Sequence, residues 1–265
     1  MKAIYRAALL VAMVALLTSM PALASEMDNR IESSARDSYV FKTYLKGDDI
    51  KIQSKDGDVT LTGIVSDESH KSFARETVVG LPGVKSVDNR IKVKGEGPAE
   101  NTDAWLMMKV KSTLLLHRSV SVSTTEVDVK DGIVTLRGAA ASQAQKELTT
   151  EYAKDVEGVK DVYNEMTVTL TKTSILQDYP ELKRATTVKT RTVGEKIDDA
   201  SITAQIKMAL LLHRSTSALN TKVETNDGIV TMYGKARNAA EKELVTKLVN
   251  DINGVMSINN QMTVE

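Results

Sequence analysis

The sequence contains no cysteine, few aromatic residues and no excess of charge of either sign. Without cysteine there are no disulfides, no thiolate metal sites, no cysteine nucleophile and no lipidated N-terminal cysteine. The 35 basic residues are balanced by 35 acidic ones, whereas a nucleic-acid partner needs a concentrated excess of Lys and Arg. Aromatic residues are only 4% of the 265 residues, and Trp105 is the single tryptophan. The composition predicts a globular protein that does not bind nucleic acid.

Long hydrophobic runs are absent except near the N-terminus. There Lys2 and Arg6 precede an apolar run over residues 7–17, and Ala22-Leu23-Ala24 places small residues two apart. This pattern predicts a secretory signal peptide over residues 1–24, cleaved after Ala24. The run is shorter than the roughly 20 residues that a membrane span needs, with a retained anchor as the alternative. We therefore expect an exported chain whose mature part has no transmembrane segment, and the lack of cysteine favours a Gram-negative periplasm.

What the sequence does contain is an internal repeat. The segment Asp131–Thr135 recurs unchanged as Asp227–Thr231, 96 residues later, and a diverged copy begins at Asp56. In each copy a second glycine, a Gly-Val pair and an asparagine follow at fixed distances. These positions are Gly63, Gly83 and Asn89; Gly138, Gly158 and Asn164; and Gly234, Gly254 and Asn260. Three copies in one register predict three tandem domains.

Each copy predicts the order helix, strand, strand, helix, strand. Apolar residues recur every four positions in the first helix, as at Leu106, Val110 and Leu114. The Asp-Gly pair between the first two strands favours positive φ and a tight hairpin. The expected N-caps are Asp28, Asp103 and Asp199 for the first helix and Asp67, Ser142 and Asn238 for the second. The predicted fold class is α+β, with three tandem αββαβ domains, each a three-stranded sheet with two helices on one face.

The copies set the expected domain boundaries at residues 27–94, 102–170 and 198–265. A short Gly/Pro connector follows the first domain and is expected to hold the first two domains close together. Residues 171–197 fit no copy and predict a linker, which as a flexible coil would span on the order of 30 Å and free the third domain from the second. Two alternatives are that its apolar residues dock on a domain, or that its basic half lies near anionic lipid headgroups.

The repeated residues resemble the BON domain, a family named for bacterial osmotically inducible and nodulation proteins. The resemblance rests on the pattern Asp-Gly-x-Val-x-Leu-x-Gly, seen at Asp131 to Gly138, followed by a capped helix and by Gly158-Val159 with Asn164. A signal peptide followed by such domains is similar to osmotically inducible periplasmic members, and to two-domain lipoproteins that bind anionic phospholipid. The resemblance implies envelope or osmotic-stress protection through membrane binding, without catalysis or cofactor. It also implies an alternative role as a periplasmic chaperone for unfolded exported proteins.

The candidate lipid-binding surface is one face of the first helix of domain 2. Its tryptophan is expected at headgroup level and its lysine beside phosphate, a pairing favoured at the lipid–water interface. Two-domain lipoproteins of the family similarly carry Asp-x-Trp here, matching Asp103-Ala104-Trp105. The alternative is that the tryptophan packs against a neighbouring domain or against residues 171–197. The predicted lipid-binding residues are Trp105, Met108, Lys109, Ser112 and Leu116.

His117 and His213 stand at equivalent positions of two domains, each followed by Arg. We expect them to supply positive charge at the end of the first helix, as Lys42 does in domain 1, because that end of the helix dipole is negative. No carboxylate or cysteine lies at metal-ligand spacing from either histidine, so no metal site is expected. The repeated glycines lack the Lys-Ser/Thr of a phosphate-binding loop. No Ser-His-Asp set or acid pair recurs, and we predict that the protein is not an enzyme.

Overall fold

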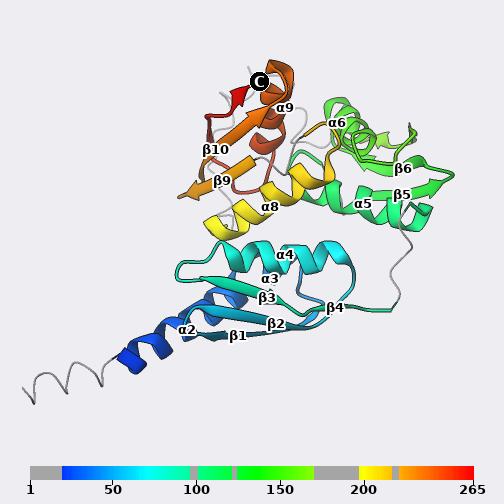
Figure 1. Ribbon diagram of the computed structural model, residues 1–265. Coiled ribbons are helices and arrows are strands. Elements are labelled where there is room, and N and C mark those ends of the chain that lie inside the picture. The colour runs from blue at the N-terminus through cyan, green and yellow to red at the C-terminus, as the bar shows by residue number, and fades with distance from the viewer. Residues whose placement is uncertain (1–19, 96–100, 121–123, 170–196, 217–220) are drawn as a thin grey trace, which may run out of the picture. The chain divides into compact units, whose positions relative to one another are not determined.

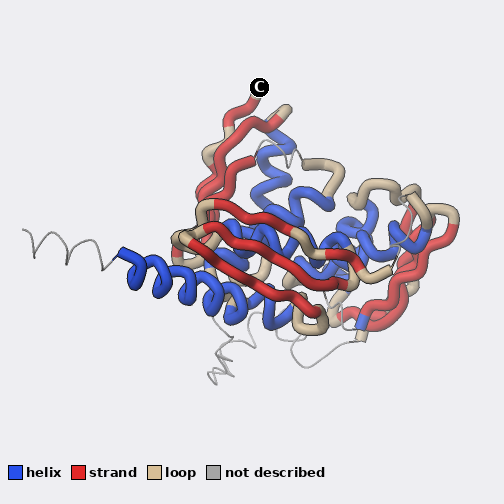
Figure 2. The backbone as a smooth tube through the Cα atoms, turned by 60° about the horizontal axis from the view of Figure 1, so that its bottom comes forward, coloured by secondary structure: helices blue, strands red, loops and turns tan. Residues whose placement is uncertain are grey.

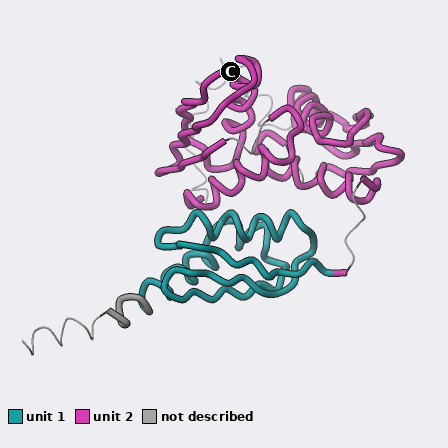
Figure 3. The backbone as a smooth tube through the Cα atoms, viewed as in Figure 1, with its two compact units in different colours: residues 1–94 teal, residues 95–265 magenta. Residues whose placement is uncertain are grey.

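The computed structural model describes residues 20–95, 101–120, 124–169, 197–216 and 221–265 (Figure 1). The chain forms two compact units, residues 1–94 and 95–265 (Figure 3). Most of the predicted signal peptide and nearly all of the predicted 171–197 linker lie outside the described residues. Both therefore stay predictions.

The first unit contains domain 1, whose strands form one layer beside its helices (Figure 2). The first helix of this domain is in two parts, with Ser38 capping the second part. Its elements are α2 (Met20–Asp37), α3 (Tyr39–Thr43), β1 (Asp49–Lys55), β2 (Asp58–Val65), α4 (Glu68–Val79), β3 (Ser86–Asn89) and β4 (Lys92–Val93).

The second unit contains domains 2 and 3, which repeat the same order with an unbroken first helix. Domain 2 consists of α5 (Asp103–Leu116), β5 (Thr125–Lys130), β6 (Ile133–Ala140), α6 (Gln143–Lys154), β7 (Asp161–Asn164) and β8 (Thr167–Val168). Domain 3 consists of α8 (Asp199–Leu212), β9 (Thr221–Asn226), β10 (Ile229–Ala236), α9 (Ala239–Asn250), β11 (Ser257–Asn260) and β12 (Thr263–Val264).

The predicted α+β fold of three repeated domains is confirmed. In domain 2, β6 is the central strand, antiparallel to β5 and parallel to β7 and β8. Its buried residues Val134, Leu136 and Ala140 face the helices, because alternate side chains of a strand point to one side of the sheet. The last predicted strand is broken in two. Asn164 lies at the break, where its Oδ1 accepts from Met166 N–H and its Nδ2 donates to Lys146 O of α6.

The N-caps were predicted correctly for the second helix of each domain and wrongly for the first helix. The second helices are capped by Asp67, Ser142 and Asn238, as predicted. The first helices of domains 2 and 3 are capped by Thr102 and Asp198, one residue before the predicted Asp103 and Asp199. In domain 1 the first helix begins before Asp28, and in all three domains this aspartate instead binds the hairpin turn.

Domains 2 and 3 contact each other directly within their unit, with α5 beside α8 (Figure 1). This differs from the expectation that residues 171–197 free the third domain from the second. The contact lies where the two first helices end, and it brings together residues far apart in the sequence.

Candidate functional site

Trp105 lies in the first turn of α5, half-buried against the edge of the domain 2 core. Its backbone N–H is held by the helix cap, donating to Thr102 Oγ1 at 3.3 Å. Lys109 stands one turn further along, with Nζ 4.3 Å from the centroid of the indole ring. At this distance the ammonium is attracted to the ring face, worth roughly 0.5–1 kcal/mol at a partly exposed site. The predicted pairing of Trp105 with Lys109 is therefore present in the fold.

The charge of Lys109 is not presented freely to solvent. Its side chain is only 15% exposed, and Nζ lies 3.7 Å from Oε2 of Glu157. Because Glu157 follows α6, this ion pair ties the start of α5 to the other helix of the domain. A phosphate approaching Trp105 would compete with Glu157 for the same ammonium.

The other predicted lipid-binding residues do not share one exposed face. Met108 and Ser112 are half-buried, and Leu116 is completely buried at 0% exposure. Leu116 therefore cannot contact a lipid while the protein is folded as described. The outward side of α5 carries Lys111 and Leu115 instead, and Leu115 is 39% exposed. The helical period predicts Leu116 on the same face as Trp105. It does not show that Leu116 is the last residue of α5, directly before the buried His117.

A pocket of about 440 Å³ opens beside Trp105. The helix start and the hairpin turn form its walls, and the Nζ of Lys160 donates to the backbone oxygen of Asp131 across it. The remaining lining residues are Asn101, Thr102, Asp103, Leu106, Gly132 and Gly158. Trp105 thus borders a hollow that is lined mostly by polar residues and glycines.

His117 and His213 meet at the contact between domains 2 and 3. The Nε2 atoms of the two rings lie 3.0 Å apart, and the residues are only 1% and 2% exposed. Both histidines cap the C-terminal ends of their first helices, as expected. They are buried there, however, and the lowered pKa of His117 leaves it without the expected positive charge. They form the centre of an interdomain contact, because the first helices of the two domains end against each other.

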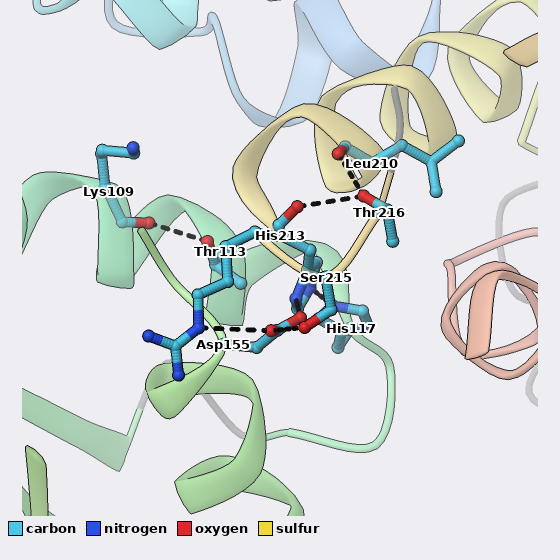
Figure 4. Close-up of polar contacts among 9 residues, drawn as sticks. Lys109, Thr113, His117, Asp155, Leu210, His213, Ser215 and Thr216 are labelled. Atoms are coloured by element: carbon cyan, nitrogen blue, oxygen red, sulfur yellow. Dashed lines mark hydrogen bonds and ion pairs between the residues drawn. The ribbon is translucent and has the colours of Figure 1, made fainter. Parts of the chain in front are cut away.

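The contact is reciprocal, since each domain supplies both a His-Arg-Ser segment and an aspartate that follows its second helix. We call these residues (117–119 and 155 of domain 2, 213–215 and 251 of domain 3) the clasp. Figure 4 shows His213, Ser215 and Asp155 directed toward one another across the two domains. The bonds are Arg118 N–H to Asp251 O (2.9 Å), Ser119 Oγ–H to Asp251 Oδ1, Arg214 N–H to Asp155 O (2.9 Å) and Ser215 Oγ–H to Asp155 Oδ1.

The two halves of the clasp differ at one residue. His213 Nδ1 lies 2.8 Å from Asp155 Oδ2, whereas His117 Nδ1 lies 3.5 Å from Asp251 Oδ2. The difference follows from Tyr152, whose hydroxyl donates to Asp251 Oδ2 at 2.8 Å and whose ring stacks on His117 at 3.8 Å between centroids. The buried Nδ1 of His117 is left without a hydrogen-bond partner among the described residues.

Burial and neighbouring charge shift the pKa values within the clasp. Burial lowers the pKa of His117, Asp251 opposes this shift, and the nearby His213 adds to it. Burial by itself raises the pKa of the Asp155 carboxyl, but His213 and the hydroxyl of Ser215 more than offset this and hold that pKa below its usual value. The aspartates are therefore charged and His117 is neutral at pH 7.

The clasp contains serine, histidine and aspartate, but its geometry does not activate a nucleophile. In a hydrolytic triad the serine hydroxyl bonds to the imidazole, which removes its proton. Here Ser215 Oγ–H donates to the Asp155 carboxylate, and the Nε2 atom of His213 faces Nε2 of His117. No group of three or more His, Asp or Glu side chains in the described ranges is arranged to hold a metal ion. Among the described helices, none is both long and apolar enough to cross a membrane.

Sequence reasoning missed the aspartates because each comes from the other domain, with no fixed spacing from its histidine. A signal was nevertheless present. The His-Arg-Ser segment and the aspartate occur together in domains 2 and 3, whereas domain 1 has Lys42 and Gly80 at the equivalent positions.

Comparison with known proteins gives one family. A family model described as BON domain matches residues 27–95, 102–169 and 198–265, which together are more than half of the chain. Among curated relatives, the chain is 28% identical over 160 residues to the "Osmotically-inducible protein Y" of Escherichia coli (strain K12), covering 60% of this chain and 71% of the relative. It is 30% identical over 116 residues to the "21 kDa hemolysin" of Actinobacillus pleuropneumoniae, covering 43% of this chain and 59% of the relative.

Among solved structures, the chain is similar to CdsD, a structural protein of the type III secretion system of Chlamydia trachomatis. The identity is 15% and the TM-score 0.24, over 91% of this chain and 92% of that chain. A similarity this distant supports no functional conclusion.

Proposed function

This chain belongs to the BON-domain family, and from that premise we propose that it is a non-enzymatic periplasmic protein that binds anionic phospholipid surfaces and protects the cell envelope under osmotic stress. The similarity to an osmotically inducible protein supports the physiological setting. The predicted signal peptide over residues 1–24 supports export.

The observation that carries the lipid proposal is the position of Trp105. It is half-exposed at the start of α5 with the Lys109 ammonium over its ring, and Lys111 and Leu115 lie on the outward side of the same helix. An indole at headgroup level, with ammonium groups and an exposed aliphatic side chain on the same helix, suits an anionic lipid surface. Leu116 takes no part in this surface, because it is buried.

The test uses the single tryptophan as its own probe. Purified residues 25–265 are mixed with phosphatidylglycerol vesicles or with phosphatidylcholine vesicles and assayed by co-flotation and by tryptophan emission. We expect flotation with phosphatidylglycerol only, weakened by salt, with a blue-shifted emission quenched by brominated lipid. An emission spectrum that stays unchanged while the protein floats would place the lipid contact elsewhere than on Trp105.

Trp105→Ala is expected to lose flotation. Tyr163→Ala is the matched control, because Tyr163 is an aromatic residue of the same domain, 56% exposed on β7. Circular dichroism of both variants separates lost binding from lost folding. Equal flotation of both folded variants would overturn the assignment to Trp105, and no flotation of the wild type would overturn lipid binding itself.

A chaperone role is the second candidate, favoured by apolar side chains on the sheet of domain 3. Ile229 at the start of β10 is 51% exposed and Met256 before β11 is 78% exposed. These two residues give an unfolded client an apolar surface at the end of the sheet next to the hairpin turn. We expect Ile229→Ser with Met256→Ser to abolish any suppression of client aggregation, whereas Trp105→Ala leaves it unchanged. Failure of the wild type to suppress aggregation would remove this candidate.

A further inference from the structure

The centre of the clasp has room for only one proton between the two imidazoles. Their Nε2 atoms are 3.0 Å apart, so one nitrogen donates and the other accepts. If both rings were protonated, two N–H groups would face each other at that distance and two positive charges would share a buried site. The closed clasp therefore requires that at least one ring is neutral.

We propose that His117 and His213 form a proton-controlled clasp, which holds domains 2 and 3 together while the rings share one proton and opens when both are protonated. Opening takes one proton from solvent for each ring that is neutral in the closed clasp, and it leaves two imidazolium rings exposed to water. The reciprocal backbone bonds of Arg118 and Arg214 to the facing aspartates break in the same step.

The charged groups around the rings decide which histidine stays neutral. His213 has Asp155 at 2.8 Å, with Arg214 Nε 3.7 Å from the same carboxylate. His117 has Asp251 at 3.5 Å, and that carboxylate also meets Arg118 Nε at 3.7 Å.

Around His117, Tyr152 is the remaining titratable neighbour. Its hydroxyl donates a hydrogen bond to Asp251. Burial and the neighbouring Asp251 raise the pKa of Tyr152, so the phenol stays neutral over the whole pH range considered. The Asp251 carboxylate is thus shared among several donors, which weakens its support of a charged His117. Glu151 and Lys154 are the other charged residues that line the pocket next to Asp155 and Arg214.

The direction of the pH dependence follows from the lowered pKa of His117. In the open state His117 takes a proton near its ordinary pKa of 6.5, but in the closed state it takes one only at lower pH. The closed state is therefore favoured above pH 6.5, and its population relative to the open state decreases as the pH falls below that value. The aspartates have pKa values lowered from 3.8, so their own loss of charge begins only below that pH. A pH near 5 separates the histidine effect from the carboxylate effect.

The clasp is specific to domains 2 and 3. Lys42 and Gly80 occupy the equivalent positions of domain 1, and they supply neither an imidazole nor a carboxylate. The third histidine, His70, belongs to domain 1, where its Nδ1 lies 2.6 Å from Oδ2 of Asp48. It therefore provides a matched control.

The absence of cysteine from the chain makes the distance between domains directly measurable. Glu126→Cys on β5 and Asn226→Cys on β9 are exposed positions for a pair of spin labels. We expect one narrow distance distribution at pH 7.5 and a longer, broad one at pH 5.0. The ratio of open to closed molecules is expected to rise by up to about 30-fold over this range.

In the labelled chain, His117→Gln is expected to keep the narrow distribution at pH 5.0, because only one ionisable ring remains at the contact. His70→Gln is expected to open as the wild type does. A wild-type distribution that is the same at both pH values would overturn the proposal, as would opening of His117→Gln to the wild-type extent.

A second measurement does not depend on any variant. Nitrogen-15 chemical shifts of the three imidazoles at pH 6 report their charge and tautomer in the wild-type chain. We expect His117 to be neutral while the clasp is closed. Observation of two charged rings in the closed clasp would overturn the proposal, even if His117→Gln disturbs folding.

Discussion

Asp28, Asp103 and Asp199 hold the same position in the three domains and bind the same feature, the turn between the first two strands. In domain 2 the Asp103 carboxylate accepts from Asp131 N–H at 2.7 Å and from Gly132 N–H at 2.9 Å. These amides point out of a turn whose two central residues have φ of 53° and 80°. The carboxylate therefore ties the first helix to the hairpin, a role that helix-capping preferences alone do not suggest.

Removal of this carboxylate is expected to destabilise domain 2. Asp103→Ala leaves two amides without their acceptor and is expected to cost about 1–3 kcal/mol of unfolding free energy, with Asp103→Asn losing about half as much. Urea unfolding followed by Trp105 emission measures this in the right domain, because the chain has one tryptophan. Asp128→Ala, at an exposed carboxylate of β5, is the control. Equal stability of Asp103→Ala and Asp128→Ala would contradict the role given to Asp103.

At the scale of the elements, the three copies of the repeat made the fold predictable. Comparing the copies fixed the hairpin turn, the second helix and its cap in one register, and the structure confirms them. The starts of the first helices of domains 2 and 3 were wrong by one residue. In domain 2, Thr102 and Asp103 both suit an N-cap, and only the position of the hairpin decides between them. The partner of Asn164 at the break in the last strand was outside the reach of pattern reasoning, because Lys146 lies on another element, α6.

Gly138 in β6 shows how closely the two hairpin strands approach. Its φ is 119°, and a Cβ there would lie 1.8 Å from the backbone oxygen of Thr124. Gly138→Ala therefore requires the strands to separate, and we expect a loss above about 2 kcal/mol.

Gly132→Ala is the matched control for Gly138→Ala. Gly132 also has positive φ, but its Cβ would meet only the flexible side chain of Lys160 at 3.2 Å. We expect a loss of about 1 kcal/mol, from the backbone conformation alone. Unfolding followed by Trp105 emission compares the two variants, and a larger loss for Gly132→Ala would contradict this account of the hairpin.

Tyr152 of α6 has no aromatic counterpart in α9, where Leu248 holds the equivalent position. Tyr152→Phe keeps the ring on His117 and removes the hydroxyl bond to Asp251. We expect the clasp to weaken by about 1 kcal/mol. Amide hydrogen exchange of Arg118 is the measurement, since that N–H donates across the clasp to Asp251 O. Tyr163→Phe, at an exposed position of β7, should leave this exchange unchanged. Identical exchange in both variants would show that the hydroxyl adds nothing.

At the scale of the whole chain, the sequence predicted the domains but not their pairing. Each histidine finds its aspartate in the other domain, so no local spacing reveals the partner. The segment over residues 171–197 was interpreted from its composition as a linker that frees the third domain. Composition describes the connection between two domains and says nothing of the surfaces that they present to each other. The candidate site shows the same limit, because Leu116 lies on the predicted face of α5 but is buried near the clasp.

The pairing of domains 2 and 3 makes a prediction about unfolding. Met232 is fully buried in β10, and Met232→Ala is expected to cost domain 3 about 2–5 kcal/mol. Because the clasp stabilises domain 2 only while domain 3 is folded, the transition detected by Trp105 should also move to lower urea, although Met232 lies in the other domain. This shift measures the free energy that the clasp gives to domain 2.

The control removes the clasp and keeps both cores. In a chain carrying Asp155→Ala and Asp251→Ala, Met232→Ala should still destabilise domain 3 but should no longer move the transition detected by Trp105. A shift of the same size with and without the clasp would mean that the domains are coupled through other contacts, such as α5 with α8. No shift in either background would mean that the clasp contributes no net free energy, because a favourable contact between two folded domains stabilises both of them.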